Sequence, residues 1–549
     1  MLLDIRTDHL KMIRDVLHRH VPQHVVWAFG SRVKWTAKDY SDLDLCICTD
    51  KPLDFRILGA LAEDFSDSDL PYKVDVVDWA VTSDSFRQVI EKNKITIQEK
   101  QLANDMACDW KTTTLGNICK TQGGAIQTGP FGSQLHTSDY RESGTPVVMP
   151  TNIWEGGIAT ASIARIGQLD VERLSQHKLQ IDDIVFSRRG DVTKNALIRA
   201  HEVNWLCGTG CLKVRLGDES IATAKFVSYS LRLQATKVWL VRHAVGATMP
   251  NLNTGILSAV PINLPPLKIQ LEITKILSVL DERITLLRET NVTLEAIAQA
   301  LFKSWFVDFD PVRAKQEGLE PEGMDEATAA LFPDSFEESE LGLVPTGWSI
   351  TTIADAFEIN PSRTLKKGTL APYLDMASLA TSGHCVDAPI QREMGSGTKF
   401  RNGDTLLARI TPCLENGKSA FVDFLLDDQI CWGSTEFLVL RPKNPLPEYF
   451  GYLLCRHPKF RNYAIQSMVG TSGRQRIQND VLGQYLLALP NNQVVSVFSD
   501  VVKSIQESIA INHQTATTLA ALRDTLLPRL ISGQLRLPEA DTIIEKAAA

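Results

Sequence analysis

The sequence lacks any uninterrupted apolar run of about 20 residues, the length that a membrane-spanning helix needs. Its first residues, MLLDIRTDHLKMIRDVL, mix acids and bases throughout and do not have the pattern of a secretory leader. We therefore expect a cytoplasmic protein with no membrane partner. With 549 residues, of which 44% are apolar and 22% charged, the chain has an ordinary globular composition and room for about three or four domains.

Paired cysteines are also missing. The ten cysteines are scattered, with no C-x-x-C pair and no pair of histidines nearby, which argues against a structural zinc site. We expect reduced thiols in the core. The sequence has no G-x-x-x-x-G-K-[ST] loop, so a phosphate-binding loop of the P-loop type is not expected either.

A strong excess of positive charge is the third feature that the chain lacks, since its formal net charge is −8. Most of this acidity lies in segment 307–345, which carries 11 acidic and 2 basic side chains. Segments 110–265 and 346–490 are net positive by 5 and 2. Such an excess permits contact with nucleic acid, and its small size suggests that another protein supplies much of the phosphate binding.

What the sequence does have is an internal repeat at an offset of 221 to 226 residues. The matches keep their order along the chain. They are Asp183 with Asp404, Arg188 with Arg409, Thr209 with Thr435, Gly246 with Gly470, and Leu264-Pro265 with Leu489-Pro490. The repeat predicts two globular units of the same fold.

A long helical pattern follows each Leu-Pro, with mostly apolar residues spaced alternately four and three apart. The positions are Leu280, Ile284, Leu287, Asn291, Leu294, Ala298, Leu301 and Trp305 after the first, and Ile505, Ile509, Asn512, Ala516, Leu519, Arg523, Leu526 and Leu530 after the second. This spacing is typical of a coiled-coil seam. We expect the two helices to pack on each other, with Asn291, Asn512 and Arg523 fixing their register. The alternative is that each helix is buried separately against its own globular unit.

A helix of about 40 residues is roughly 60 Å long, which suits a spacer. Two globular units that alternate with two such helices, paired antiparallel, form a pseudo-two-fold object. An object of this kind meets two patches of one DNA duplex, as dimeric repressors meet their half-sites. The predicted fold class is therefore multidomain α/β (α+β), with two antiparallel coiled-coil helices.

At this point the ordered motifs resemble a known family. They are the entry tryptophans Trp110 and Trp348, a Gly-Asp or Asp-Asp strand start followed by an arginine, a Gly-Thr or Ser-Thr segment, Leu-Pro, and a helix that ends in LFKSWFVDFDPVRAK. The set looks like a specificity subunit of type I restriction-modification systems. The C-terminal LRDTLLPRLISGQL is also similar to that family.

The resemblance implies a non-catalytic DNA reader. It implies target recognition domains at 110–265 and 346–490, spacer helices at 266–306 and 491–535, an acidic linker at 307–345 and a tail at 536–549. Each recognition domain would bind one half of a split sequence in double-stranded DNA. Two adenine methyltransferase subunits would dock on the spacer helices, and restriction-translocase subunits would join for cleavage; the region itself needs no cofactor.

Base edges are read by side chains that match their hydrogen-bonding pattern, with Arg or Lys on guanine and Asn or Gln on adenine. The candidates for DNA binding are Arg188, Arg189, Lys194, Thr248, Asn251 and Asn253 in the first unit, and Arg409, Ser472, Arg474, Gln475 and Arg476 in the second. The alternative is structural: Asp183 and Asp404 close turns, while Arg188 and Arg409 pair with them or with phosphates.

Residues 1–104 lie outside the repeat. A helical stripe precedes a strand, HVVWAF, that ends at Gly30-Ser31, and a second strand, DLDLCIC, places Asp42 and Asp44 on one face. Two carboxylates so spaced can hold a hard cation. In a third strand, KVDVVDW, Asp75 and Asp78 point to opposite faces, so at most one of them joins the pair.

This N-terminal pattern resembles a minimal nucleotidyltransferase. The resemblance implies that Gly30 and Ser31 cradle nucleotide phosphates, that Asp42 and Asp44 bind Mg²⁺ with a nucleoside triphosphate, and that Asp75 completes the catalytic site or deprotonates the acceptor. Trp35 stands where that family often has glycine.

Three readings follow. The leading one is a DNA-specificity subunit that acts through methyltransferase and restriction partners. The second is an enzyme of the kind found in toxin-antitoxin systems, a nucleotidyltransferase that modifies a protein or RNA hydroxyl and uses the repeat for DNA targeting. The third is a scaffold that reads no sequence.

Overall fold

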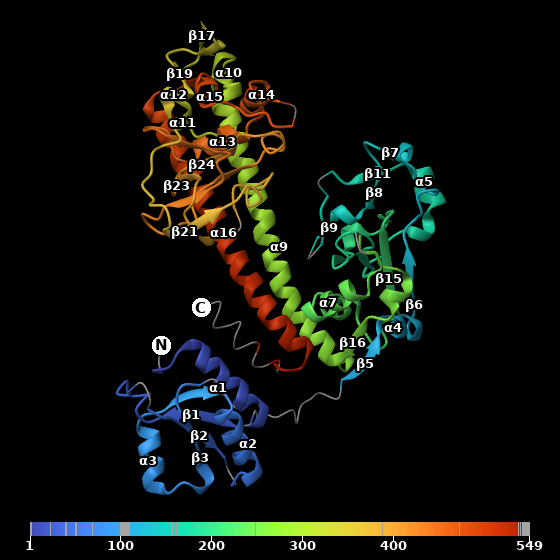
Figure 1. Ribbon diagram of the computed structural model, residues 1–549. Helices are drawn as coiled ribbons and strands as arrows, with labels where there is room; N and C mark the ends of the chain where they lie inside the picture. The colour runs from blue at the N-terminus through green and yellow to red at the C-terminus, as the bar shows by residue number, and fades with distance from the viewer. Residues whose placement is uncertain are drawn as a thin grey trace. The chain divides into compact units, whose positions relative to one another are not determined.

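The fold is described from a computed structural model (Figure 1). The described residues are 3–540, with gaps at 22–23, 39–40, 50–51, 69, 99–109, 155–156, 161, 247–248, 387, 472, 536 and 538–539. The chain divides into two compact units, one of Met1–Ile276 with Leu526–Ala549 and one of Leu277–Thr525. Among the described residues, no helix is both long and apolar enough to cross a membrane.

The N-terminal domain is a four-stranded sheet with order β3-β2-β1-β4, in which β2 and β3 are parallel and the other neighbours are antiparallel. Its core is made of the apolar faces of α1 and α2 on the central strands. Its elements are α1 (Thr7–His20), β1 (Val25–Phe29), β2 (Leu43–Cys48), α2 (Phe55–Ser66), β3 (Val74–Asp78), η1 (Trp79–Val81), α3 (Asp84–Lys92) and β4 (Ile95–Gln98). The predicted second and third strands are thus β2 and β3.

The first globular repeat, residues 110–265, begins and ends on a pair of antiparallel strands, β5 and β16. Between them lie two four-stranded sheets, β13-β12-β15-β6 and β14-β8-β11-β7. The strands are β5 (Lys111–Thr114), β6 (Gly123–Thr128), β7 (Tyr140–Arg141), β8 (Thr145–Val148), β9 (Ile153–Trp154), β10 (Gly157–Ile158), β11 (Ala164–Ile166), β12 (Ile184–Ser187), β13 (Asn195–Leu197), β14 (Leu206–Cys207), β15 (Cys211–Gly217) and β16 (Pro261–Leu264). Its helices are α4 (Leu115–Thr121), α5 (Gln168–Arg173), α6 (Ala224–Leu231), α7 (Gln234–His243) and α8 (Thr254–Ser258), with 3-10 turns η2 (Thr137–Asp139), η3 (Pro150–Asn152), η4 (Ser175–His177) and η5 (Ala200–Glu202).

The second globular repeat, residues 346–490, has the same plan. Strands β19 and β28 join its two ends, and its sheets are β25-β24-β27-β20 and β22-β21-β26-β23. Its strands are β19 (Ser349–Thr352), β20 (Phe357–Ile359), β21 (Leu370–Leu374), β22 (Ile390–Glu393), β23 (Thr398–Phe400), β24 (Thr405–Ala408), β25 (Ser419–Phe421), β26 (Cys431–Gly433), β27 (Phe437–Pro442) and β28 (Leu486–Leu489). Its helices are α12 (Ile353–Ala356), α13 (Phe450–Arg456), α14 (Pro458–Gln466) and α15 (Asn479–Gly483).

The two repeats agree even in local detail. The side chain of Thr114 caps α4 by accepting from the backbone of Asn117, and Thr352 caps α12 by accepting from Asp355. Strands β12 and β24 are buried along their whole length, which is why three of the four residues in each are apolar and neither sequence alternates.

Two long helices follow the repeats, α9 (Leu267–Lys303) and α16 (Asn492–Ile531). They lie side by side and antiparallel (Figure 1). Asp281, early in α9, contacts Arg523, late in α16, whereas Asn291, later in α9, contacts Ile509, earlier in α16. Ile284 and Leu287 are buried against Ala516 at the seam. The antiparallel coiled coil that the four-three spacing predicts is confirmed.

The predicted polar seam residues contact each other. The Asn512 amide nitrogen donates to the Asn291 side-chain oxygen at 2.9 Å, and the Asn291 amide nitrogen donates to the Ile509 carbonyl at 3.0 Å. Arg523 pairs with Asp281 at 2.7 Å. Since a half-buried amide that loses its hydrogen-bond partner costs free energy, these contacts favour one register.

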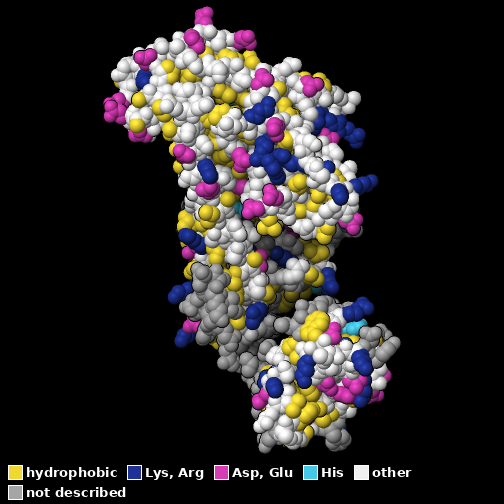
Figure 2. Space-filling model, turned by 90° about the vertical axis from the view of Figure 1, so that its left-hand side faces the viewer, with side chains coloured by type: hydrophobic (Ala, Val, Ile, Leu, Met, Phe, Trp, Pro, Cys, Tyr) yellow, Lys and Arg dark blue, Asp and Glu magenta, His cyan; other side chains and the backbone are white. Residues whose placement is uncertain are grey.

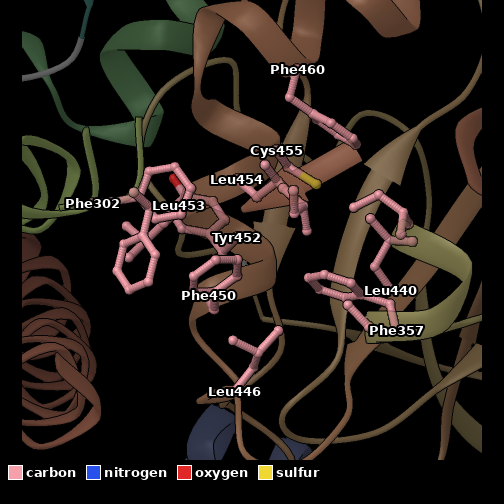
Figure 3. Close-up of a cluster of buried hydrophobic side chains, with 14 of the residues drawn as sticks. Phe302, Phe357, Leu440, Leu446, Phe450, Tyr452, Leu453, Leu454, Cys455 and Phe460 are labelled. Atoms are coloured by element: carbon pink, nitrogen blue, oxygen red, sulfur yellow. The ribbon is translucent and has the colours of Figure 1, made fainter. Parts of the chain in front are cut away.

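The end of α9 carries the aromatic core of the second repeat. A π-helix, η6 (Ser304–Asp308), continues α9 and is followed by α10 (Asp310–Gln316). Phe302 meets Phe450 edge-on, with ring centroids 5.0 Å apart (Figure 3), and Phe306 meets Phe498 of α16 at 4.7 Å. The extra residue of the π-turn sits where these rings pack. The distinctive LFKSWF sequence is therefore the hydrophobic joint between α9 and the second repeat.

Segment 307–345 also has elements of its own beyond α10. They are α11 (Glu326–Ala329), β17 (Phe336–Ser339) and β18 (Gly342–Pro345), the last two forming a hairpin. Phe332 and Val344 from this segment are buried in the same core cluster as Phe306. Its acidic side chains are thus carried on a segment anchored by apolar contacts.

Two neighbouring leucines of α9 test the seam. Leu287 is 6% exposed and Leu286 is 52% exposed. We expect Leu287→Ala to lower the free energy of unfolding by about 2–5 kcal/mol, because it leaves a cavity at the helix contact. Leu286→Ala should change it by less than about 0.5 kcal/mol. Urea unfolding followed by circular dichroism measures both; equal losses would contradict the packing.

Candidate functional sites

In the first repeat, the predicted DNA-binding residues come together from two distant segments. The Leu252 backbone nitrogen donates to the Arg188 carbonyl at 2.9 Å, and Arg189 forms a β-bridge with Asn251. The Arg188 Nε donates to the Asn251 side-chain oxygen at 3.3 Å. Arg189 is exposed and Arg188 half-buried. The two segments therefore present one surface that combines guanidinium and amide groups.

The second repeat pairs the equivalent segments. Ile410 and Val469 each form a β-bridge with Arg476. The Thr411 nitrogen donates to the Gln475 carbonyl at 3.1 Å, and an Arg409 guanidinium nitrogen donates to the Ile477 carbonyl at 2.7 Å. The same pair of loops is thus built twice, after β12 and β24 and before α8 and α15.

Some of the candidates have structural contacts of their own. Asn253 caps α8 through the Ile256 nitrogen at 2.8 Å. Arg476 makes a two-nitrogen contact with Glu436, whose hydrogen bonds hold the pKa of that carboxyl below its usual value. Lys194 is half-buried in the turn that follows Arg189, and Arg474 is exposed. Thr248 and Ser472 lie outside the described residues.

The alternative interpretation was that Asp183 and Asp404 close turns and that Arg188 and Arg409 pair with them. The first part is correct and the pairing is not. Asp183 accepts from the Gln180 nitrogen and Asp404 from the Arg401 nitrogen, both at 2.8 Å, so both aspartates close turns as expected. Their ion-pair partners are not Arg188 and Arg409.

Asp183 pairs with Arg215 at 2.6 Å, and Asp404 pairs with Arg363 and Arg441, both at 2.8 Å. The reason is strand pairing: β15 runs beside β12, and β27 beside β24, which brings an arginine of the neighbouring strand to each aspartate. Arg215 and Arg441 are 226 residues apart, the offset of the internal repeat, and this match in the sequence could have identified them as equivalent partners of the two aspartates. Arg188 and Arg409 therefore do not neutralise these two aspartates.

The charged side chains on the surface agree with the small net positive charge of the two repeats. Figure 2 shows Lys and Arg side chains interspersed with Asp and Glu over the face that it displays. Clustered charge of one sign is what strong non-specific phosphate binding needs.

In the N-terminal domain, the predicted carboxylates lie at one end of the parallel strand pair. The register sets Asp44 of β2 beside Asp75 of β3. Burial, followed by the charges of Asp75 and Asp42, raises the pKa of Asp44. Asp75 also pairs with Lys73 at 2.6 Å. The cluster thus concentrates negative charge, which a bound cation would relieve.

Gly30 lies directly against this cluster. Its φ is +83°, and a Cβ at that position would lie 2.1 Å from the Asp44 Oδ2. Only glycine allows both this backbone conformation and the close approach. In the following turn, the Thr36 nitrogen donates to the Ser31 carbonyl at 3.1 Å. Trp35 in this turn is 58% exposed and has φ +57°, a conformation that glycine adopts more readily.

Asp78 belongs to the scaffold, as the strand alternation predicts. It accepts from the Leu53 nitrogen at 2.7 Å and the Ala80 nitrogen at 3.0 Å. Within the described ranges, no three His, Cys, Asp or Glu side chains converge closely enough to hold a metal ion alone. The Asp42 and Asp44 pair instead fits Mg²⁺ that is also bound by nucleotide phosphates, since Mg²⁺ commonly takes one or two carboxylates with substrate oxygens.

The Gly30 contact gives a test by hydrogen exchange. We expect Gly30→Ala to destabilise the N-terminal sheet by about 1–3 kcal/mol, because the methyl group strains the left-handed backbone and displaces the Asp44 carboxylate. Gly59→Ala, in α2 with open space around its Cβ, is the control and should be neutral or slightly stabilising. Exchange of the β1 and β2 amides reports the difference, and equal protection in the two variants would refute the contact.

Comparisons with known proteins find two different families along the chain. Residues 108–296 match the family model of the type I restriction modification DNA specificity domain, and residues 11–102 match the polymerase beta nucleotidyltransferase family. The chain is 24% identical to the HindI type I specificity subunit of Haemophilus influenzae, over 54% of this chain and 73% of that protein. It is 22% identical to the MjaIX specificity subunit of Methanocaldococcus jannaschii, over 58% of this chain and 70% of that protein.

The N-terminal domain has a relative of its own. It is 52% identical to the probable protein adenylyltransferase MntA of Haemophilus influenzae, over 18% of this chain and 87% of that protein. Both resemblances found in the sequence are thereby confirmed. Beyond its N-terminal domain the chain is similar to type I restriction-modification specificity subunits, and it carries, ahead of its repeats, a nucleotidyltransferase domain of the MntA family.

Proposed function

We propose that this chain directs a type I restriction-modification complex to a split DNA sequence, with one half read by residues 110–265 and the other by residues 346–490. The observation that supports this most is the repeated pair of loops. Arg188, Arg189 and Asn251 in one repeat, and Arg409 and Gln475 in the other, lie on loops that the same fold brings together. Two copies of one reading surface suit a target with two halves.

The side chains on these loops suit both positioning and reading. An arginine contacts guanine through O6 and N7, while asparagine or glutamine contacts adenine through N6 and N7. The Arg188–Asn251 hydrogen bond would pre-orient the guanidinium and the amide in the first repeat. In the second repeat, Glu436 neutralises Arg476, so Arg409 and Arg474 are the cations that we assign to DNA contact. Contacts to phosphates position the loops, and contacts to base edges supply the sequence information.

The paired helices are proposed to set the distance between the two half-sites. Helix α9 alone has 37 residues, or roughly 55 Å at about 1.5 Å per residue. The exposed flanks of α9 and α16 are the proposed docking sites for two adenine methyltransferase subunits, with restriction-translocase subunits joining for cleavage. We assign methylation and cleavage to those partners, as in the family that the sequence resembles.

Exchanging one repeat tests this function. In cells that hold the partner subunits, we expect replacement of residues 110–265 by the corresponding segment of another specificity subunit to change one half of the methylated motif. The other half should stay, because residues 346–490 still read it. Sequencing of methylated adenines measures the motif, and an unchanged motif would refute the assignment of this segment.

Two sets of arginine variants give a matched control. Arg188→Gln with Arg189→Gln should relax or weaken recognition in one half, and Arg409→Gln in the other half. Each change removes contacts of about 1–3 kcal/mol. If both sets weakened both halves equally, the arginines would be general phosphate contacts rather than readers.

A second function is supported by the carboxylate cluster of the N-terminal domain. We propose that it transfers a nucleotidyl group to a protein or RNA hydroxyl. The acceptor oxygen bonds to the α-phosphorus of a nucleoside triphosphate, the bond from that phosphorus to pyrophosphate breaks, and Asp75 takes the hydroxyl proton. Mg²⁺ held by Asp42, Asp44 and phosphate oxygens would neutralise charge on the leaving pyrophosphate.

Labelled ATP tests the transfer. We expect label on protein or RNA when the full chain is incubated in extract with Mg²⁺ or Mn²⁺, and a loss of at least about a hundredfold with Asp42→Ala and Asp44→Ala, because the cation is no longer held. Asp67→Ala, an exposed aspartate at the end of α2, is the control. No transfer by the unmodified chain with either cation would contradict the activity and leave the DNA-reading function untouched.

A further inference from the structure

Each repeat exposes a valine beside the loop that carries its candidate arginines. Val245 in the first repeat is 63% exposed, and Val469 in the second is 55% exposed. The two positions are 224 residues apart, which is within the offset of the internal repeat, and a glycine follows each valine. An apolar side chain at such a place gains little free energy from burial within the chain itself. Its presence at the same place in both repeats therefore points to a contact outside the chain.

In the first repeat, backbone pairing sets Val245 in line with two candidate DNA-binding residues. The Val245 nitrogen donates to the Asn251 carbonyl at 3.0 Å, and the Asn251 nitrogen donates to the Val245 carbonyl at 2.9 Å. Asn251 is bridged in turn to Arg189, on the loop after β12. Residues directly opposite each other in an antiparallel ladder carry their side chains on the same face. Val245, Asn251 and Arg189 therefore form a row of an apolar group, an amide and a guanidinium.

The second repeat builds the same ladder with different polar residues. The Val469 nitrogen donates to the Arg476 carbonyl at 3.0 Å, and the Arg476 nitrogen donates to the Val469 carbonyl at 2.9 Å. Arg476 is bridged in turn to Ile410, on the loop after β24. Arg476 and Ile410 are half-buried, and Glu436 pairs with Arg476 at 2.7 Å. Val469 is thus the most exposed member of its row, and the valine is the one side chain that the two rows share.

The glycine after each valine holds the paired segments close together. Gly246 has φ +111°, and a Cβ there would lie 2.6 Å from the Met249 carbonyl oxygen. Gly470 has φ +136°, and a Cβ there would lie 2.9 Å from the Arg474 carbonyl oxygen. Only glycine allows this backbone conformation together with so close a return of the chain. The backbone therefore fixes the position of the valine beside each glycine.

Other exposed apolar side chains of the first repeat are not kept in the second. Ile181 is matched by Asn402 at an offset of 221, and Val238 by Asn462 at an offset of 224. Single exposed apolar residues of this kind are common on protein surfaces and need no function. The valines differ from them because they are kept in both repeats and because they stand in register with the candidate reading loops.

We propose, on the basis of the DNA-reading function above, that Val245 and Val469 each pack against the 5-methyl group of a thymine. The major groove of DNA admits a pair of strands, and thymine is the base that presents a methyl group there. An apolar side chain reads this group, which guanidinium and amide groups do not detect. The row in the first repeat then offers one side chain each for thymine, adenine and guanine.

Deoxyuridine tests the contact, because it differs from thymidine by the missing 5-methyl group. The probe is a duplex with the motif that sequencing of methylated adenines identifies, in which each thymine is replaced in turn. Competition binding uses the full chain assembled with its methyltransferase subunits. We expect one replacement in each half of the motif to weaken binding about threefold to fivefold, since the burial of one methyl group is lost.

The same measurement separates this inference from the function on which it rests. If the unmodified complex prefers its motif but no deoxyuridine replacement weakens binding, the thymine contact is wrong and the DNA-reading function stands. If the complex shows no preference for the motif, the DNA-reading function itself fails, and the thymine contact fails with it.

Alanine variants identify the side chain that makes each contact. Val245→Ala should abolish the effect of deoxyuridine in the half read by the first repeat and keep it in the other half, and Val469→Ala should do the reverse. Leu169→Ala, at an exposed position of α5, is the control and should keep both effects. An effect that survived in the matching valine variant would assign the methyl contact to another group and overturn the proposal. Equal weakening of thymine and deoxyuridine duplexes would also overturn it, because an apolar wedge between base pairs needs no methyl group.

Discussion

The structure depends on the antiparallel contact between α9 and α16. Apolar burial at Ile284, Leu287 and Ala516 drives the two helices together but would tolerate a shift along the axis. The Asn291–Asn512 and Arg523–Asp281 pairs do not tolerate such a shift, because moving one helix by a heptad leaves half-buried amides and a half-buried guanidinium without these partners. One register is thus selected by polar groups in an apolar seam, at some expense of stability.

The two repeats share a scaffold and differ in their surfaces. Buried strands, capping threonines and the Asp183–Arg215 and Asp404–Arg441 pairs recur, so the same sheets form twice. The loops after β12 and β24 carry different side chains on the same backbone plan. A scaffold held by ion pairs to buried aspartates and by apolar strands leaves these loops free to vary.

Much of this was predictable from the sequence because it is periodic or repeated. Each of three features has a regular spacing along the sequence: the seam positions, the two repeats and the Asp-x-Asp strand. The partners Arg215 of Asp183 and Arg441 of Asp404 were missed because they lie on neighbouring strands, whose pairing a single sequence does not specify. The π-turn at Ser304–Asp308 was missed because it depends on contacts of Phe306 with the distant rings of Phe450 and Phe498.

The most direct test of the account is a pair of distances between spin labels on the two long helices. One pair is placed at Val279 and Thr525, and the other at Val279 and Ser504; all three positions are exposed. Antiparallel pairing in the observed register predicts that the first pair lies at the same level of the seam. It predicts that the second pair is separated by roughly 30 Å along the axis, at about 1.5 Å per residue. A short distance for Val279 and Ser504, with a long one for Val279 and Thr525, would contradict it.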